Sequence, residues 1–211
     1  MLHPTTRADI RTRILQTAFG LLADHGVAWL TQPRVSRAAG VRQSHLTYYF
    51  PRRADLLAGV ARYFVESHSG IWLARAKQGK LGVNRLPGVL TEALTDRRSV
   101  RAMLGIISAA DEDPQIRDAL RDLVRLIRER LAALLGVLSM PNDPGSVALV
   151  HTIIVGAAVL HHARADARAR HEADMAVRFI AALLPTLHVP AARRPRGGSR
   201  RHSPAQKEIP A

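Results

Sequence analysis

The stretch "AAGVRQSHLTYYFPRRADLL", Ala38 to Leu57, decides the fold of this chain. Among the eight residues from Gln43 to Phe50, only Leu46 and Phe50 are plainly core-forming, and they lie four positions apart. The other six carry polar or hydrogen-bonding tips. Pro51 disfavours helical geometry at the residue before it, so a helix over this segment ends there. We interpret the segment as a short helix with one buried row and a polar outer side.

The residues upstream predict two further helices. Apolar residues at helical spacing define one face of a helix that ends near Gly26; they are Ile10, Ile14, Ala18 and Leu21. A short helix is expected over 32–39, with Thr31 as its N-cap and Pro33 in its first turn. Gly40 supplies the tight turn before Gln43. Two short helices joined by such a turn and packed on a longer one predict a helix-turn-helix unit.

The rest of the chain also reads as helices. A helix is expected to start near Arg52, with Asp55 in its first turn, and to continue through Ile71. Asp113 and Pro114 are expected to begin a later helix, and Ser146 to cap another. Further helices are expected over 86–95, 100–110, 114–135, 147–168 and 173–184. No segment shows the alternation of a strand, so the predicted fold class is all-α.

Charge points to a polyanionic partner. The formal net charge is +14, of which residues 1–63 carry +6 and the Pro-, Gly- and Arg-rich end, Ala191 to Ala211, carries +5. We expect residues 189–211 to form a disordered basic tail. Its arginines are explained either by a solvated segment or by added non-specific affinity for DNA. Deleting residues 191–211 and measuring the salt dependence of binding distinguishes these alternatives.

Several function classes find no support in the sequence. The chain has no cysteine, and its start lacks the apolar run of a signal peptide. The longest apolar stretch, Val147 to Leu160, is shorter than the roughly 18 residues that span a bilayer. No phosphate loop, nucleophile elbow or paired carboxylate appears, so we predict no catalytic residue and no cofactor. His161, His162 and His171 lack a recognised metal-ligand spacing, and we assign them a solvated or interface role. We expect a cytoplasmic protein that is not an enzyme.

The polar side of the short helix suits DNA. In a helix-turn-helix the second helix enters the major groove, where its first residues meet base edges. Gln43 and Ser44 stand at that start, with Thr47 and Tyr48 one turn later. Glutamine can bond both N6 and N7 of adenine. Flanking arginines can neutralise phosphates; they are Arg42, Arg52 and Arg53. The alternatives are a merely solvated face and, for Tyr48 and Tyr49, packing on the preceding helix.

The block "GVAWLTQPRVSRAAGVRQSHLTYYFPRRADLLAGV", with "RTRILQTAFGLLADHG" before it, resembles the DNA-binding domain of TetR-family transcriptional regulators over about residues 7–60. By this resemblance the family's usual DNA-contact positions are held by Gln43, Ser44, His45, Thr47 and Tyr49. Thr31 or Gln32, together with Arg34, lies at the phosphate-facing start of the preceding helix, and Arg53 replaces a usual lysine. Thr47 and Arg42 stand where the family commonly has Tyr and Ser. The operator sequence therefore cannot be borrowed from a relative.

The resemblance also implies the organisation of the chain. It implies a helix-turn-helix domain over 1–51 and a helical effector-binding and dimerisation domain over 52–188. The last two helices would form a homodimer on a palindromic double-stranded operator, and an unidentified small-molecule effector would release this repressor. Candidate effector contacts are Trp72, Met103 and Ile107, which ordinary core packing explains equally well. His68 and His151 are further candidates, because they are polar residues on otherwise apolar helix faces.

Two other classes stay open. One is a helical small-molecule-binding protein or enzyme with a vestigial helix-turn-helix; activity that survives replacement of Gln43, Tyr49 and Arg53 would favour it. The other is a membrane-surface protein that uses its basic ends. Neither terminus contains a basic, amphipathic helix, which argues against the membrane class.

Overall fold

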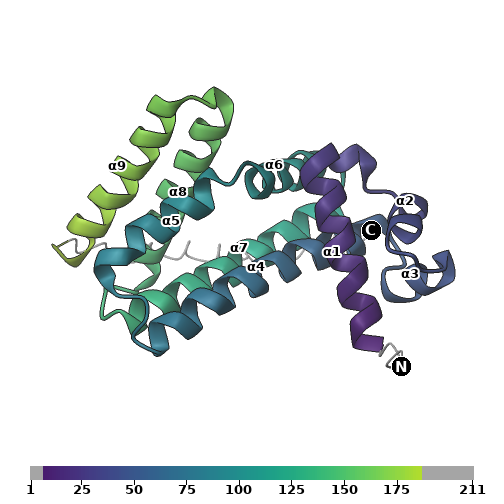
Figure 1. The fold of residues 1–211 in the computed structure, drawn as a ribbon, viewed down its shortest axis with the longest axis horizontal. Coiled ribbons are helices and arrows are strands. Elements are labelled where there is room, and N and C mark those ends of the chain that lie inside the picture. Colours follow the sequence, from purple (N-terminus) through teal and green to yellow (C-terminus); the bar gives the residue numbers. More distant parts are fainter. Residues whose placement is uncertain (1–6, 187–211) are drawn as a thin grey trace, which may run out of the picture.

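The computed structural model describes residues 7–186, so the predicted basic tail lies outside the described residues. Within this range the chain forms helices and no strand, as predicted (Figure 1). The α-helices are α1 (Arg7–His25), α2 (Gln32–Ala38), α3 (Gln43–Tyr49), α4 (Arg53–Lys77), α5 (Leu86–Thr95), α6 (Arg97–Glu112), α7 (Pro114–Val137), α8 (Pro144–Arg164) and α9 (Ala167–Leu183). The short 3-10 helices are η1 (Val27–Trp29), η2 (Val83–Arg85) and η3 (Leu184–Thr186).

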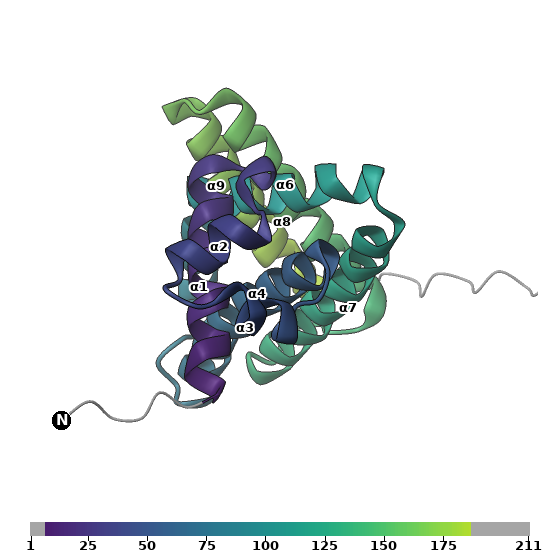
Figure 2. The same ribbon diagram turned by 90° about the vertical axis from the view of Figure 1, so that its right-hand side faces the viewer.

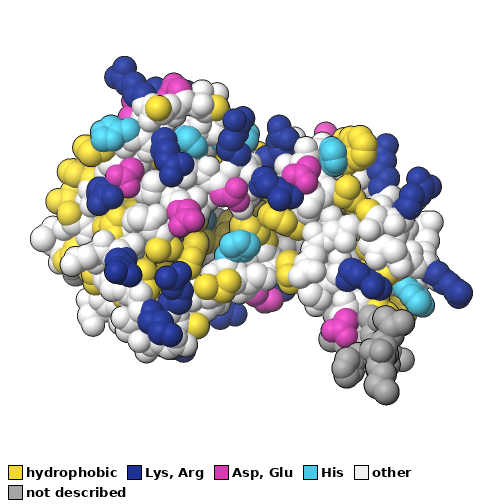
Figure 3. Space-filling model, in the orientation of Figure 1, with side chains coloured by type: hydrophobic (Ala, Val, Ile, Leu, Met, Phe, Trp, Pro, Cys, Tyr) yellow, Lys and Arg dark blue, Asp and Glu magenta, His cyan; other side chains and the backbone are white. Residues whose placement is uncertain are grey.

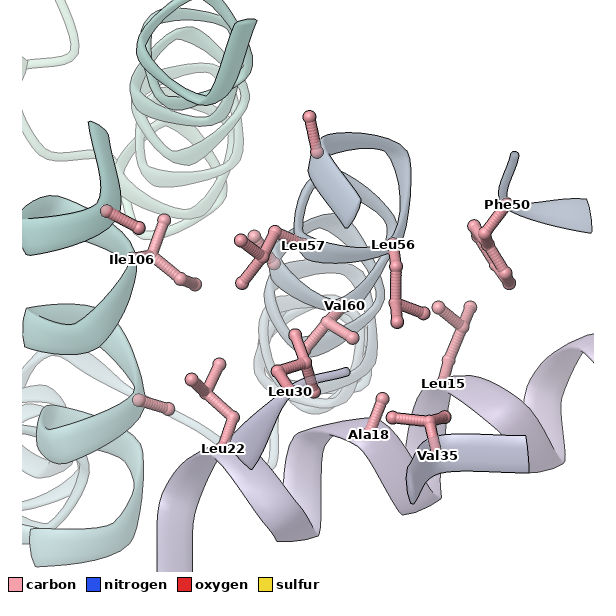
Figure 4. Packing of buried hydrophobic residues seen from close by; sticks show 14 of the residues in the cluster. Leu15, Ala18, Leu22, Leu30, Val35, Phe50, Leu56, Leu57, Val60 and Ile106 are labelled. Carbon is pink, nitrogen blue, oxygen red and sulfur yellow. The ribbon is translucent and has the colours of Figure 1, made fainter. Parts of the chain in front are cut away.

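Helices α1, α2 and α3 gather at one end of the molecule, which Figure 2 views face on. Leu46 is fully buried and Phe50 is 3% exposed, so the predicted inward row of α3 is confirmed. Figure 4 shows the core they belong to, in which side chains from α1, α2, α4 and α6 converge. The fold is an N-terminal helix-turn-helix followed by a larger helical domain.

The two parts of the chain share one core cluster. Leu56 and Val60 of α4, Ile106 of α6 and Ile116 of α7 belong to the same cluster as Leu46 of α3. The expected domain boundary at residue 51 therefore lies just before α4, a helix that packs against both the helix-turn-helix and the larger domain. A second cluster lies among α5, α8, α9 and the end of α7.

In the larger domain, α4 and α7 run side by side along the molecule (Figure 1). Helices α8 and α9 pack on one another at the end opposite the helix-turn-helix, and α5 packs on both. Helix α6 crosses from this region to α1. Both α4 and α6 therefore extend from the helix-turn-helix into the larger domain.

The start of α8 corrects the sequence prediction. Asp143, not Ser146, is the N-cap: its carboxylate accepts hydrogen bonds from the backbone of Gly145 at 3.0 Å and of Ser146 at 3.1 Å. Ser146 lies inside the first turn and donates its hydroxyl to Asp143 at 2.5 Å. These bonds hold the pKa of Asp143 below its usual value. Proline at the first helical position suits such an Asp-Pro start.

The junction between α8 and α9 also differs from the prediction. Helix α8 ends at Arg164, because Ala165 adopts a left-handed backbone with φ of 53°. Asp166 then caps α9 by accepting a hydrogen bond from the backbone of Ala169 at 2.5 Å. The predicted end at 168 and start at 173 were wrong, because a run of Ala and Arg favours helix and hides the cap.

Helix α8 is 21 residues long and, by length and composition alone, apolar enough to cross a membrane; it is the one such helix in residues 7–186. The apolar run 147–160 on its own is predicted to be too short to span a bilayer, whereas the helix that contains this run is long enough. Core helices of soluble proteins have the same composition, and α8 packs against α5, α6, α7 and α9.

Gly59 leaves the space that the ring of Phe50 fills. A Cβ on Gly59 would lie 2.7 Å from Cε1 of Phe50 and 3.1 Å from Cδ2 of Leu15, and both side chains are buried. We predict that Gly59→Ala lowers the free energy of unfolding by about 1–3 kcal/mol, because overpacking outweighs the gain in helix propensity. Urea denaturation measures this change.

Gly70→Ala is the matched control in the same helix. No atom lies within 4 Å of the added Cβ, so this variant is expected to gain about 0.5–1 kcal/mol from helix propensity alone. Equal stabilisation by the two substitutions would show that Phe50 is not tightly packed against α4.

Candidate nucleic-acid interface

The outer side of α3 faces solvent. Gln43, Ser44 and His45 are exposed, and their side chains form no hydrogen bond with the described residues. Tyr48 is 70% exposed, so it does not pack on the preceding helix. Tyr49 is half-buried and packs against the first core cluster. The first turn of α3 therefore presents free donors and acceptors, while its opposite side is buried.

Thr47 is less available than its neighbours. It is half-buried, and its hydroxyl donates to the carbonyls of Gln43 at 3.1 Å and Ser44 at 3.2 Å within the helix. Its oxygen can still accept a hydrogen bond. Tyr48 and Tyr49 meet edge to face, with ring centroids 5.1 Å apart.

Gln32 joins the two short helices. Its Nε2 donates to the carbonyl of Phe50 at 2.8 Å and to that of Pro51 at 3.0 Å. The start of α2 is therefore tied to the end of α3, and the amide nitrogen of Gln32 is used inside the protein. Thr31 holds the predicted N-cap position of α2 in extended geometry, but its side chain makes no capping bond.

The arginines around these helices differ in their partners. Arg34 lies over the ring of Trp29 at 4.5 Å, and Arg53 donates to the carbonyl of Val27 at 2.8 Å. Each guanidinium keeps further donors, because arginine has five. Arg42 directly precedes α3, is exposed, and makes no ion pair with the described residues.

Arg52 is engaged at the start of α4. Its guanidinium donates to both carboxylate oxygens of Asp55, at 3.1 Å and 3.0 Å, and its backbone N–H donates to the same carboxylate at 3.0 Å. The hydrogen bond from Arg52 holds the pKa of Asp55 below its usual value. Arg52 is therefore less free to meet a phosphate than Arg42.

Acidic residues are absent from the segment that contains α2 and α3, since none occurs between Asp24 and Asp55. The sequence reasoning overlooked Arg37, which is exposed on α2 and makes no ion pair with the described residues. Arg37 lies two residues after the apolar Val35, which places it on the opposite, outward side of the helix; this spacing could have identified it from the sequence.

A pocket of about 250 Å³ lies in the larger domain, between α1, α4, α5, α6, α7 and α8. Figure 3 shows a hollow surrounded by hydrophobic side chains near the centre of one face. Of the predicted effector contacts, the pocket brings together His68, Trp72, Met103 and His151. Ile107 does not line it and is 37% exposed.

Sequence reasoning missed Arg130, which also lines the pocket. It belongs to the Arg-, Asp- and Glu-rich face of the predicted 114–135 helix, and nothing in that pattern separates a pocket arginine from a solvated one. His151 is 9% exposed, and its pKa is lowered by burial and, secondarily, by the charge of Arg128. Among the described residues no His, Cys, Asp or Glu cluster could hold a metal ion.

Helix α6 connects this pocket to the helix-turn-helix. It contributes Met103 and Ile106 to the pocket. On its other side Arg98 forms an ion pair with Asp24 at 2.9 Å, and Arg101 donates to the carbonyl of Asp24 at 3.0 Å. The end of α1 is thus attached to a pocket wall.

Residues 14–60 match the family model described as "Bacterial regulatory proteins, tetR family", which confirms the family recognised in the sequence. The matched residues run from α1 into α4 and include the whole helix-turn-helix. This segment is therefore similar to the DNA-binding part of that family. None of the curated proteins compared with the chain matches it.

Solved structures share the fold over most of the chain. A TetR transcription regulator from Haloarcula marismortui has a TM-score of 0.65 at 21% identity, covering 84% of this chain and 98% of its own. A TetR-family member from Streptomyces coelicolor A3 has a TM-score of 0.63 at 22% identity, covering 87% and 99%. A putative transcriptional regulator from Saccharomonospora viridis, in complex with choline, has a TM-score of 0.63 at 17% identity, covering 82% and 95%.

Gln32 and Gln43 are the first residues of α2 and α3, and replacing each in turn tests which of the two holds the helix-turn-helix together. We predict that Gln32→Ala lowers the free energy of unfolding by about 1 kcal/mol, because two carbonyl contacts between α2 and α3 are lost. Gln43→Ala is the control and should change stability by no more than about 0.5 kcal/mol, since its side chain is exposed and unbonded. Chemical denaturation measures the free energy of unfolding of both variants. A larger loss in Gln43→Ala than in Gln32→Ala would contradict the structural role assigned to Gln32.

Proposed function

We propose that this protein is a transcriptional repressor that binds a palindromic operator in double-stranded DNA as a homodimer and leaves it when a small-molecule effector binds. One observation carries the proposal. Helix α3 is anchored through Leu46 and Phe50 while Gln43, Ser44 and His45 face solvent, in a segment with no acidic residue. A solvated helix face alone does not call for such an excess of positive charge.

The proposed contacts divide by role. Base-edge contacts are assigned to the free side chains at the start of α3, and phosphate contacts to the arginines around it. The residues proposed to contact DNA are Thr31, Gln32, Arg34, Arg42, Gln43, Ser44, His45, Thr47, Tyr48, Tyr49 and Arg53. Within this set the internal bonds of Gln32, Arg34 and Arg53 make positioning of the unit their first role. We therefore expect Gln43 and Arg42 to show the clearest effects on DNA binding.

A homodimer through the last two helices is supported by an exposed apolar face. Leu160 of α8 is 65% exposed, and Met175 and Phe179 of α9 are 55% and 66% exposed. Gly156, one turn before Leu160, is also exposed and leaves room for close approach. One helix-turn-helix contacts a single half-site, so pairing of two copies through this face accounts for binding to a palindrome.

Release by an effector is supported by the position of the pocket. Helix α4 lines the pocket and begins at Arg53, which holds the carbonyl of Val27. Helix α6 lines it as well and holds Asp24 at the end of α1. A ligand that prefers one arrangement of α4 and α6 shifts the population of the two helix-turn-helix units toward it. Because half-sites lie about one DNA turn apart, a changed separation weakens binding.

The action we propose is binding rather than catalysis, in the cytoplasm where the operator is accessible. The choline in the Saccharomonospora viridis neighbour supports small-molecule binding by this fold. A vestigial helix-turn-helix is disfavoured by the free polar face of α3. A membrane role for α8 is disfavoured by its packing on four neighbouring helices.

Selection of bound duplexes from a random pool tests operator binding. We expect two inverted half-sites with centres about 34–36 Å apart. Gln43→Ala should cost about 1–3 kcal/mol on the selected site and relax specificity at one position of each half-site. Arg42→Ala should weaken binding to all sequences alike and reduce the salt slope by about one.

Gln115→Ala, at an exposed glutamine in the first turn of α7, is the matched control and should bind like the unaltered protein. Titrations followed by fluorescence anisotropy across a salt series give both quantities. A pool without any recovered motif would contradict operator binding, and full specificity in Gln43→Ala would contradict the role of α3.

The dimer has its own test. Phe179→Asp places a charge on the proposed interface and should convert the dimer to a monomer in sedimentation velocity at micromolar concentration. Ile71→Asp is the control, because Ile71 is a large apolar residue on α4 with a similar exposed fraction, 57%. A monomeric unaltered protein, or equal effects of both substitutions, would refute this interface.

A further inference from the structure

The polar groups that line the pocket are few, and none of them is acidic. Three already have partners inside the protein. Ser69 donates to the carbonyl of Val65 at 2.5 Å, and the hydroxyl of Ser99 bonds to Asp96. Nδ1 of His68 lies 2.9 Å from a carbonyl oxygen one turn earlier in α4. These groups need no ligand.

The remaining polar groups have no partner. Arg130, His151 and Trp72 line the pocket, and their side chains make no hydrogen bond or ion pair with the described residues. Arginine and the indole N–H donate only, and histidine can donate from one ring nitrogen. The free polar groups of the pocket are therefore mainly donors, and a ligand that satisfies them must bring acceptors.

The positive charge of Arg130 indicates that the ligand is negatively charged. Arg130 is partly buried in an apolar pocket with no acidic residue in the lining. A buried charge is costly unless it is paired, so an anion inside the pocket would supply the missing partner. His151 is nine-tenths buried, and the charge of Arg128 acts on it too. The positive charges of Arg130 and Arg128 together make this part of the pocket favourable to negative charge.

A cationic ligand such as a quaternary ammonium fits less well. Such ligands bind to the open faces of several aromatic rings. In this pocket Phe64 is engaged by Phe19, with centroids 4.9 Å apart, and by His68 at 4.1 Å. Among the Phe and Trp rings of the pocket only Trp72 has no aromatic partner, and Arg130 repels a cation.

The volume limits the size of the ligand. An apolar cavity of roughly 150 Å³ binds benzene, so the 250 Å³ here corresponds to about ten non-hydrogen atoms. Aliphatic side chains from α4, α6, α7 and α8 form most of the lining. The body of the ligand is therefore apolar.

We propose that the pocket binds an apolar monocarboxylate of about ten non-hydrogen atoms, whose carboxylate pairs with Arg130 and accepts hydrogen bonds from His151 and Trp72. This ligand class rests on the proposed function of the pocket as the effector site.

Three probes of nearly equal size test the class: octanoate, its neutral analogue octanamide, and hexyltrimethylammonium. Isothermal titration calorimetry on the full chain without DNA gives the affinities. Octanoate should bind more tightly than octanamide by about tenfold or more, since a charge-assisted contact is lost in the amide. Hexyltrimethylammonium should bind most weakly or not at all.

Variants locate the effect. Arg130→Met keeps the aliphatic stem and should reduce octanoate binding to the level of octanamide, whereas Arg130→Lys keeps the charge and should retain the preference. Arg125→Met is the matched control on α7, because Arg125 is exposed and paired with Asp122 at 3.2 Å. Thermal denaturation confirms that each variant is folded, and the comparison of probes on the unaltered protein needs no variant.

The proposal is overturned if octanamide or hexyltrimethylammonium binds as tightly as octanoate, if none of the three binds, or if Arg130→Met keeps the preference. Operator titrations separate it from the proposed function. Octanoate binding with unchanged operator affinity would refute effector release but not the ligand class. Operator binding by a protein that does not take up octanoate would refute the ligand class alone.

Discussion

The burial of Leu46 and Phe50 in the core shared with α1, α2 and α4 is the contact on which the helix-turn-helix end of the molecule depends. Helix α3 has seven residues, too few to be stable alone in water, so its geometry comes from packing rather than from helix propensity. Gly59 makes the packing possible, because it leaves the ring of Phe50 against the backbone of α4. Gln32 fixes the end of α3 from the other side. With one row held this firmly, the opposite row is free to face a partner.

The same helices that hold α3 also form the pocket. The pocket is lined by side chains from these helices: Phe19 and Leu22 of α1, Val60 of α4 and Ile106 of α6. Close-packed interiors move as discrete arrangements rather than by gradual deformation, so the proposed ligand would act on the position of the helix-turn-helix. Asp24, held by α6, is the point where a wall of the pocket meets the helix-turn-helix.

Much of the fold follows from local sequence. Helix α5 has the predicted bounds, and Asp113 and Pro114 begin α7 as predicted, because caps, proline and apolar spacing all agree there. The ends at the α8–α9 junction were wrong, since the left-handed Ala165 interrupts a stretch whose composition favours helix. The pocket was only partly foreseen. His68 and His151 stand out as polar residues on apolar faces, but Arg130 looks like any solvated arginine of an amphipathic helix.

By itself the sequence determined the all-α class, the helix-turn-helix and the outward side of α3, because these depend on spacings of three or four residues within one segment. Tertiary structure decided which side chains are already in use. Gln32 and Gln43 are the same residue type at the starts of neighbouring helices, yet one is bonded to the end of α3 and the other is free. It also decided that Arg130 shares a pocket with His151 and Trp72, which lie on three different helices. Such a meeting depends on how whole helices pack, and no local pattern in a chain encodes it.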